Sequence, residues 1–429
     1  MNTTHHTAVV AFPQRTRHAT GRHTLSDRAG YWLAAGVIGL GLYASLTPSP
    51  LYRTYSALWH FSTLTLTLIY ATYAFGVLAA LLLAGRVSDD VGRRPVLLAA
   101  LSVQMGATVL FLLASSAAWL FVARGLQGLA TGAALSAASA ALLELHPRRD
   151  PTGVALTNGT AAGAGVGLGV LVSSALVQAG WEPRLLPYLV LLGLFALALF
   201  GAYLMPEPVR DRKPLRLTIE PPQVPAVVRR PFLLAALAVL ASWTIAALFY
   251  SLGSQLGGQL FHTHDAIVSG LGVVLLSAAG VSAQILTGRS APWIATSGGS
   301  TALAAGIVLI VIAAATGSTT SYLAGAIIAG AGFGAAFLGG LRALVAQIPA
   351  QHRAAVLSAF YVVAYAALSL PAILAGVAVS YITLQSTFEI FGGIAAAIGL
   401  LVAFLAWHTR PAQPTEQTEH NETDLRLAA

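Results

Sequence analysis

The feature that most constrains this chain is a short charged stretch, Gly85–Pro95, set between two long apolar runs. The runs, Tyr70–Ala84 and Val96–Ala114, contain no charged residue. A bilayer core about 30 Å thick is crossed by about 20 apolar helical residues, because each residue advances a helix by about 1.5 Å. The pattern therefore predicts two membrane-spanning helices joined by a very tight charged turn.

The composition and the charge distribution favour a membrane protein throughout. Hydrophobic residues make up 56% of the chain and charged residues only 9%, which is not the balance of a soluble globular protein. A net charge of +8 could indicate nucleic-acid binding. However, nearly all of the 23 Lys and Arg residues fall in alternate loops and in the tails, as the positive-inside rule expects of cytoplasmic segments. The chain has no Cys, which excludes disulfides and thiol chemistry.

The apolar runs predict an all-α membrane protein with twelve transmembrane helices, arranged as two six-helix pseudo-repeats around a central cavity. The predicted spans are 30–47, 63–84, 96–114, 117–143, 153–177, 186–204, 231–255, 266–287, 293–315, 321–347, 354–382 and 388–407. We expect a cytoplasmic N-terminal tail (1–29), a first bundle (30–204), a cytoplasmic linker (205–230), a second bundle (231–407) and a cytoplasmic C-terminal tail (408–429). Both termini would then lie inside the cell.

The two predicted bundles also resemble each other in sequence. With a shift of about 203 residues, Gly85 falls on Gly288 and Ser115 falls on Ser318, as a duplicated six-helix unit would require. The second copy of the charged turn lacks the acidic residues of the first.

The charged turn carries a recognisable motif, and its matching residues are Gly85, Asp89, Gly92, Arg93 and Arg94. It resembles the loop between helices 2 and 3 of the major facilitator superfamily, although Asp90 stands where that family more often has a basic residue. The resemblance implies that the Asp and Arg side chains link helix 2 to the other half of the protein. Such a charge-assisted latch would favour the outward-open state. The alternative is a positively charged turn that only fixes topology.

A second motif, Arg124-x-x-Gln127-Gly128, resembles the Arg-x-x-Gln-Gly motif of the same superfamily. Arg124 lies on the order of 10 Å inside the outer end of its predicted helix. Because a charge in lipid is costly, we expect it to face the bundle interior and to serve substrate binding or coupling, together with Gln127. The alternative is an Arg side chain that reaches back to the headgroups. Arg342 lies near the inner end of its predicted helix, and we expect its side chain to reach back to the headgroups.

The predicted span at 153–177 is rich in glycine, at Gly159, Gly163, Gly165 and Gly167. Small residues allow membrane helices to approach closely, so these positions are predicted to serve helix packing. The stretch also resembles the glycine-rich helix-5 motif of the superfamily's antiporters. It departs from that motif because Ala164 replaces a Pro and Leu168 replaces a second Gly, and a helix that serves packing alone is the alternative.

The lining of a central cavity is predicted from polar and aromatic residues within the spans. Besides Arg124 and Gln127, the candidates for substrate contact are Tyr43, Asn158, Trp243, Tyr250, Tyr361 and Tyr365, with Ser45, Tyr73, Thr244 and Gln284 as further polar or aromatic residues. Aromatic and hydroxyl groups suit a neutral or weakly amphipathic organic solute.

Groups that could bind a proton or a metal are scarce. No Asp or Glu lies in the middle of a predicted span, and every His falls in a tail, a loop or a span end. His262, His264 and Asp265 share an outer loop and could bind a metal, but ordinary loop polarity explains them, and we predict neither a metal nor a cofactor. In the other outer loop, 51–62, the aromatic residues Tyr52, Tyr55 and Trp59 are expected at the membrane interface.

These observations predict a secondary transporter of the cytoplasmic membrane that moves a small organic solute by alternating access. The resemblance is greatest to the drug-efflux (drug:proton antiporter) branch, which implies proton-coupled export of amphipathic or drug-like compounds. The alternative is a facilitator or importer of a small metabolite such as a sugar. The expected partners are a small-molecule substrate, the lipid bilayer and protons, without nucleic acid, and the expected state is a monomer. An enzyme is not expected, because the spans offer no convergent nucleophile, base or metal set.

Overall fold

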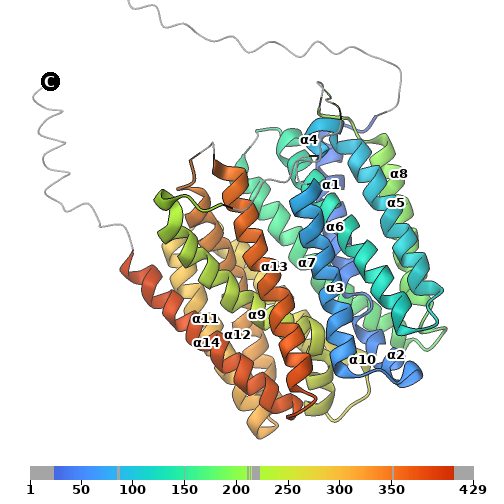
Figure 1. Cartoon of the computed structure of the whole chain (residues 1–429), viewed down its shortest axis with the longest axis vertical. Helices are drawn as coiled ribbons and strands as arrows, with labels where there is room; N and C mark the ends of the chain where they lie inside the picture. The colour runs from blue at the N-terminus through green and yellow to red at the C-terminus, as the bar shows by residue number, and fades with distance from the viewer. Residues whose placement is uncertain are drawn as a thin grey trace, which may run out of the picture.

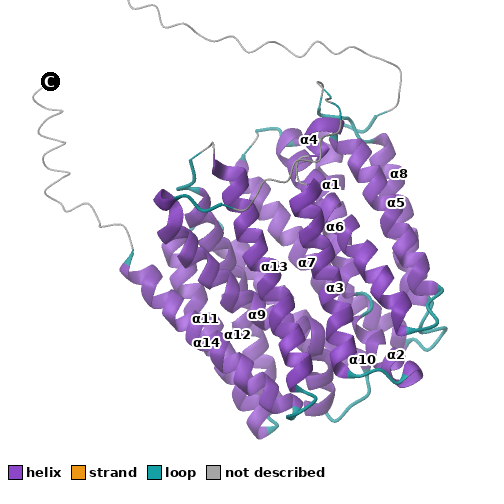
Figure 2. Ribbon diagram, viewed as in Figure 1, coloured by secondary structure: helices purple, strands orange, loops and turns teal. Residues whose placement is uncertain are grey.

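The computed structural model describes residues 24–84, 87–148, 150–209, 212, 214, 223–349 and 352–409. Within these residues all regular structure is helical, and twelve helical segments are long and apolar enough to cross a membrane (Figure 2). The predicted all-α fold with twelve spans is therefore confirmed. The predicted tails lie almost wholly outside the described residues, as does much of the linker.

The helices have the following bounds. The first six spans comprise α1 (Asp27–Leu46) continued by η1 (Ser49–Leu51) and α2 (Tyr52–Trp59), then α3 (Thr63–Ala84), α5 (Arg93–Leu112), α6 (Ala117–Leu145), α7 (Pro151–Gln178) and α8 (Leu186–Leu204). The last six comprise α9 (Arg229–Leu260) with η2 (Ala226–Val228), α10 (Ala266–Thr287), α11 (Pro292–Thr316), α12 (Thr319–Val345), α13 (Arg353–Ala378) and α14 (Leu384–His408). The short helix α4 (Val87–Val91) lies in the charged turn.

Local sequence explains where several of these helices begin. At the start of α1, α10, α12 and α14 a side-chain oxygen accepts a hydrogen bond from a first-turn amide, which otherwise has no partner inside the helix. The capping residues are Ser26, Asp265, Ser318 and Thr383.

The expected loop at 51–62 is largely helical, which corrects the prediction for its aromatic residues. Pro48 and Pro50 end α1 but suit the first turn of a new helix, because their missing amide hydrogen is not needed there. Tyr52 and Tyr55 of α2 are buried rather than interfacial. The Tyr55 ring stacks on Trp59 at 4.8 Å, and its hydroxyl donates to that of Tyr188 at 3.3 Å.

The spanning helices form two sets with the same internal packing. We call α1 to α8 the N-terminal group, and α9 to α14 the C-terminal group. In the first group α3 packs on α6, α1 on α7 and α5 on α8, and in the second α10 packs on α12, α9 on α13 and α11 on α14 (Figure 1). Between the groups, α7 packs on α10 and α13 packs on α3. Helices α3 and α10 occupy equivalent positions, and both of their bounds differ by 203 residues. The sequence repeat is thus a structural repeat.

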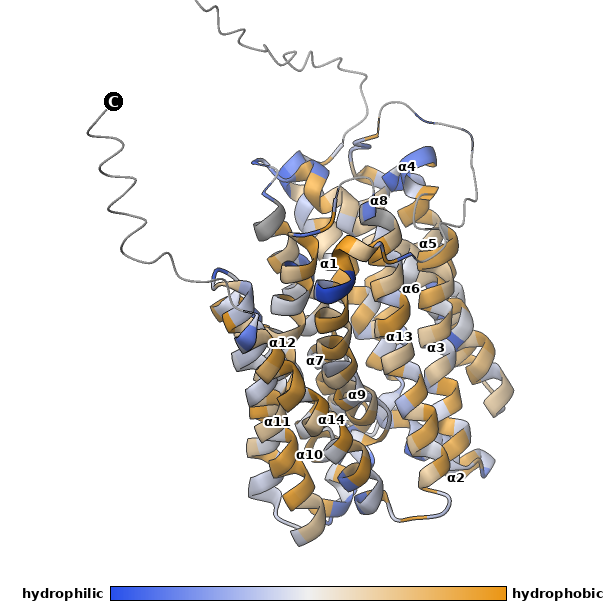
Figure 3. Cartoon of the chain, turned by 60° about the vertical axis from the view of Figure 1, so that its left-hand side comes forward, coloured by the Kyte–Doolittle hydropathy of each residue, from blue (hydrophilic) through white to orange (hydrophobic). Residues whose placement is uncertain are grey.

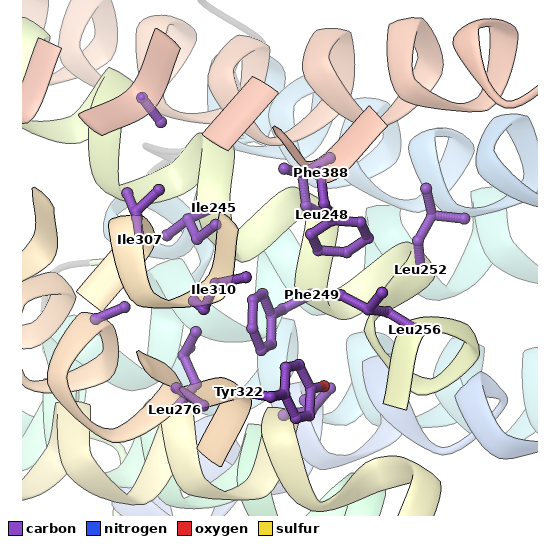
Figure 4. Packing of buried hydrophobic residues seen from close by; sticks show 14 of the residues in the cluster. Ile245, Leu248, Phe249, Leu252, Leu256, Leu276, Ile307, Ile310, Tyr322 and Phe388 are labelled. Atoms are coloured by element: carbon purple, nitrogen blue, oxygen red, sulfur yellow. The ribbon is translucent and has the colours of Figure 1, made fainter. Parts of the chain in front are cut away.

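Apolar side chains fill the interior and also cover the flanks of the bundle. In the C-terminal group, Ile245, Leu248, Phe249, Ile310 and Phe388 belong to one buried cluster (Figure 4). Large apolar side chains such as Leu197, Phe200 and Phe404 remain exposed on the flanks, as expected of surfaces that face lipid. Most strongly hydrophilic residues lie toward the ends of the helices (Figure 3). We call the two ends of the bundle the α4 end and the α2 end.

Glycine permits the closest helix contacts. A β-carbon at Gly128 of α6 would lie 2.2 Å from the Tyr73 carbonyl oxygen of α3, and one at Gly332 of α12 would lie 2.1 Å from the Leu303 amide nitrogen of α11. Any larger residue there would force the two backbones apart. The packing of α3 on α6 and of α11 on α12 therefore depends on the absence of a side chain.

Candidate functional site

The charged turn at the α4 end is built around Arg93, the first residue of α5. Its guanidinium donates to both carboxylate oxygens of Glu144 on α6, at 3.1 and 2.8 Å, and to the hydroxyl of Ser88 at 2.7 Å. It also forms an ion pair with Asp89. The Arg93 side chain is only 8% exposed, whereas that of Asp89 is 54% exposed. The two-pronged contact with Glu144 is the strong one, and it ties α5 to α6.

Gly92 and Glu207 complete this turn. The Glu207 carboxylate, just after α8, accepts from the amides of Arg93 and Arg94 at 3.0 Å each. Those first-turn amides have no helical partner, and the N-terminal end of a helix favours a negative charge. Gly92 has φ +106, and a β-carbon there would lie 2.5 Å from a Glu207 oxygen, so both conformation and space require glycine. Glu207 was not anticipated, since it has no local motif and joins the site only through folding.

The ion pairs of Arg93 with Asp89 and with Glu144 lie within the N-terminal group, and the pair of Arg212 with Glu207 lies at the start of the linker. Gly85 falls outside the described residues, and the guanidinium of Arg94 lies 5.1 Å from the centre of the Tyr203 ring. A link from Asp89 to the C-terminal group is not among the described contacts. The latch that the resemblance implies therefore stays a prediction.

Arg124 and Gln127 lie inside the N-terminal group, next to the end of α1. Both side chains are 1% exposed, so Arg124 faces the interior and does not reach back to the headgroups. Its Nη1 donates to the Ser45 carbonyl at 2.7 Å and to Gln127 Oε1 at 2.8 Å. Gln127 Nε2 donates to the Ala44 carbonyl at 3.0 Å.

The position of Pro48 explains why the Ala44 carbonyl needs a side-chain donor. In a continuing helix the Ala44 carbonyl would accept from the amide four residues later, but that residue is Pro48, which has no amide hydrogen. Gln127 supplies the missing donor. The positive charge of Arg124 also suits the C-terminal end of α1, where the helix dipole is negative.

The remaining surroundings of Arg124 are aromatic. Its guanidinium lies 4.9 Å from the centre of the Tyr73 ring and 5.8 Å from that of Tyr70. Its Nε is buried and has no hydrogen-bond partner. Among the described residues, carbonyl oxygens and ring faces stabilise the charge, and no carboxylate contacts it.

Six aromatic residues gather halfway along the bundle, where α3 of the N-terminal group meets α9 and α13 of the C-terminal group. We call Tyr70, Tyr73, Trp243, Tyr250, Tyr361 and Tyr365 the midplane aromatic cluster. Trp243 contacts Tyr365 edge-on at 5.5 Å and Phe337 at 5.6 Å. Its indole Nε1 is buried without a partner. Such an N–H is a donor that a solute could use.

The structure brings some of the predicted residues together and separates others. Trp243, Tyr250, Tyr361 and Tyr365 belong to the cluster, whereas Asn158 donates to Ser139 at 2.7 Å and joins α7 to α6. The hydroxyl of Tyr43 on α1 is buried and has no partner. Tyr70 was not predicted, although its spacing of three residues from Tyr73 could have placed it on the same face of α3.

The predicted packing glycines lie on two faces of α7. A β-carbon at Gly165 would lie 2.1 Å from the Gly39 carbonyl of α1. Those at Gly159, Gly163 and Gly167 would meet Gln284, Val281 and Ser277 of α10 at 2.4, 2.5 and 3.2 Å. Helix α7 therefore packs tightly within its own group and, on the other face, against the C-terminal group.

Arg342 of α12 closes the corresponding turn of the second repeat. Its Nη1 donates to the carbonyl oxygens of Ser290 at 3.1 Å and Thr287 at 3.4 Å, at the end of α10. The Arg342 guanidinium therefore binds backbone carbonyls of the protein. This corrects the expectation that it would reach back to the lipid headgroups. In the turn of the first repeat, the Glu144 carboxylate accepts hydrogen bonds from an arginine. In the turn of the second repeat, backbone carbonyls accept them.

Carboxylates and imidazoles lie in the outer thirds of the described spanning helices. In the described spanning helices, no Asp, Glu or His occupies the middle third. Of these residues, Glu389 lies closest to the middle of a spanning helix. The predicted span began at 388, which put Glu389 at its start. Helix α14 begins at Leu384, so Glu389 lies about 7 Å along the helix. The described residues contain no group of three or more His, Asp or Glu that could hold a metal ion.

At the α2 end, several contacts join the two groups. Arg53 Nη1 lies 3.2 Å from His264 Nδ1, and Gln178 of α7 donates to the Asp265 carboxylate. The Val268 amide and the Gln178 side chain hold the pKa of Asp265 below its usual value. A β-carbon at Gly376 of α13 would collide with Thr67 of α3. The groups are therefore in direct contact at this end.

Comparison with known proteins agrees with this architecture. The family model of the Major Facilitator Superfamily matches residues 30–316. Among solved structures, the human organic anion transporter MFSD10 (TETRAN) is similar, with a TM-score of 0.64 and 18% sequence identity over 89% of this chain and 99% of that chain. At that identity the likeness shows the fold. A comparison with curated proteins gives no match.

Proposed function

Because the chain belongs to the Major Facilitator Superfamily, and is therefore a secondary transporter in a membrane, we propose that it exports amphipathic or drug-like organic compounds from the cell in exchange for protons. In this proposal the membrane is the cytoplasmic one, and the α4 end and both termini face the cytoplasm.

The midplane aromatic cluster is the observation that supports this proposal. It lies halfway along the helices and draws side chains from both groups, so a solute bound there would contact both. Rocking of the two groups about such a site is how this class of protein alternates access. Ring faces and the free Trp243 N–H would bind a largely apolar solute that carries an acceptor group.

A second candidate is an organic anion, and the charge of the interior favours it. Arg124 is fully buried beside the cluster, and the middle thirds of the described spanning helices contain no acidic residue to balance it. Tyr73, a member of the cluster, is also the ring nearest Arg124. The similar human protein is named as an organic anion transporter. A sugar importer is less well supported, because the interior amides of Gln127 and Asn158 already bond to protein groups.

The contacts between the groups suggest how the two ends alternate. Arg53 and Gln178 join the groups at the α2 end, whereas the ion pairs of Arg93 at the α4 end lie within the N-terminal group. We take this as the conformation closed toward the outside. The Asp89 latch would form in the opposite conformation, when the α4 end closes.

The test is accumulation of a panel of cationic, neutral and anionic dyes, and of labelled sugars, in cells with and without the protein. The measurement is repeated with a protonophore. Trp243→Phe removes the free N–H but keeps an aromatic ring, and Trp293→Phe, which lies in α11 against Trp407, is the matched control. Dye exclusion that collapses with the protonophore, and is weakened by Trp243→Phe alone, supports export. Sugar uptake without dye exclusion would refute export and would show that the protein imports sugars.

A further inference from the structure

The two helix groups differ in how their positive charges are balanced at the α4 end. In the N-terminal group, Arg93 is paired with the carboxylates of Asp89 and Glu144. Between the start of α9 and the end of α14 the only carboxylates are those of Asp265 and Glu389, and both lie toward the α2 end. The C-terminal group therefore offers no acidic side chain to its own arginines at the α4 end. The described ones are Arg229, Arg230, Arg289 and Arg342.

The turn between α10 and α11 presents one of these arginines at the surface. Arg342 of α12 donates through Nη1 to the carbonyls of Thr287 and Ser290, which lie on either side of Arg289 in the sequence. The turn is thus held from within the bundle by a second positive charge. Arg289 is exposed, and none of the described residues forms an ion pair or a hydrogen bond with its side chain. Its charge is left for a group from outside the chain.

Large apolar side chains are exposed on both helices next to this turn. Ile285 and Leu286, in the last turn of α10, are 55% and 82% exposed, and Ile294, in the first turn of α11, is 48% exposed. Lipid tails are as apolar as such side chains. The rings of Trp293 in α11 and Trp407 in α14 meet edge-on at 5.7 Å near the same end, and Trp is enriched at the level of lipid headgroups. The turn therefore lies at the boundary between headgroups and acyl chains.

The chemistry at this boundary suits a phosphate that carries acyl chains. A guanidinium can donate two parallel hydrogen bonds to a phosphate, and it keeps its charge at any physiological pH. Each Arg near an anionic membrane surface strengthens binding about fivefold. A free phosphate would use only that charge, whereas a phospholipid would also place its tails against the exposed apolar side chains. The pairing of an unneutralised arginine with exposed Leu and Ile therefore favours a phospholipid over a soluble anion.

We propose that the turn between α10 and α11 binds an anionic phospholipid, with the phosphate on Arg289, the charge of Arg342 beneath the turn, and the acyl chains along Leu286 and Ile294. The site goes beyond the proposed function and rests on it only for the leaflet: with the α4 end in the cytoplasm, the lipid belongs to the inner leaflet, whose anionic lipids make its surface negative. The lipid supplies the negative charge that the C-terminal group lacks at this end. Because it binds the folded chain alone, it also stabilises that chain.

The test measures lipid binding to the purified full chain in a nonionic detergent. The protein is mixed with equal amounts of dioleoylphosphatidylglycerol, which is anionic, and dioleoylphosphatidylcholine, which has the same acyl chains and no net charge. Native mass spectrometry then counts the lipids that each protein molecule retains. We expect the anionic lipid to be preferred about fivefold or more, and to raise the midpoint temperature of unfolding further than the neutral lipid does. Inorganic phosphate at the same concentration should not displace it.

Substitutions at exposed positions assign the preference to the turn. Arg289→Gln removes the charge and should lower the preference for the anionic lipid about fivefold. Arg289→Lys keeps the charge and should retain most of the preference. Arg148→Gln is the matched control, because it removes one exposed arginine from the same end of the bundle but from the N-terminal group. It should leave the preference almost unchanged.

Equal retention of the two lipids by the native chain would refute the site. So would an equal loss of preference in Arg289→Gln and Arg148→Gln, because net charge alone would then attract the lipid. Displacement of the anionic lipid by inorganic phosphate would show a site for free anions instead. These results are separate from the proposed function: failure to export any dye would leave the lipid counts unchanged, and loss of the lipid preference would leave export standing.

Discussion

Replacement of Gln127 by Met tests whether the Arg124–Gln127 pair holds the end of α1 in place. Methionine has a similar length but neither donates nor accepts strongly. The Ala44 carbonyl would lose its donor, and Arg124 would lose one of its two acceptors. A buried polar group left without a partner costs about 1–3 kcal/mol, so the two losses predict a destabilisation of about 2–6 kcal/mol.

The cause can be isolated with a second substitution at Pro48. Pro48 has φ −73 and ψ −14, a conformation that alanine adopts without strain. Pro48→Ala would give the Ala44 carbonyl the backbone donor that it lacks. Alone it should cost no more than about 1 kcal/mol, from the greater freedom of the unfolded chain. In the Gln127→Met background it should recover about 1–3 kcal/mol, the cost of the unpaired carbonyl.

The assay is unfolding in mixed micelles with increasing dodecyl sulfate, followed by loss of helical circular dichroism, for the native chain, both single variants and the double variant. A coupling of about 1 kcal/mol or more between the two sites would support the argument. Strictly additive effects would show that Gln127 does not substitute for the missing amide of Pro48, and the structural account of the motif would be wrong.

The remaining predictions concern transport, packing and topology. If Arg124 also orients the substrate, Arg124→Lys and Arg124→Gln should both impair transport at matched protein levels, whereas a purely electrostatic role would spare Lys. Asp89→Asn should leave the fold intact, since an exposed ion pair contributes about 0–1 kcal/mol, but should slow transport; native rates would dismiss the latch. Gly165→Leu should prevent folding, because a β-carbon there would lie 2.1 Å from a carbonyl of α1, whereas Gly193→Leu, with open space around it, should be tolerated in a folding assay. A cysteine at Gln223 should resist an impermeant thiol reagent outside intact cells and react after permeabilisation; labelling from outside would reverse the proposed topology.

The sequence by itself determined the number of spans and most of their bounds. The predicted spans at 63–84, 186–204 and 266–287 coincide with α3, α8 and α10. This success has a local cause. A segment that enters lipid must satisfy its own backbone hydrogen bonds, so an uninterrupted apolar run is a helix whatever its neighbours are. The charged turn and the repeat could be recognised in the sequence for the same reason, because each is a contiguous pattern of residues.

The tertiary structure alone decided what the polar residues do. Glu207 caps α5 from beyond α8, Gln127 replaces an amide that Pro48 lacks, and Arg53 of α2 meets a histidine far along the chain. The same holds for Tyr70, which joins aromatic residues of α9 and α13. These partners lie tens to hundreds of residues apart, and their meeting depends on how helices cross and where glycine lets them approach. Hydropathy sets each helix in the membrane, but only packing between helices determines which buried polar group finds a partner and which remains free for a ligand.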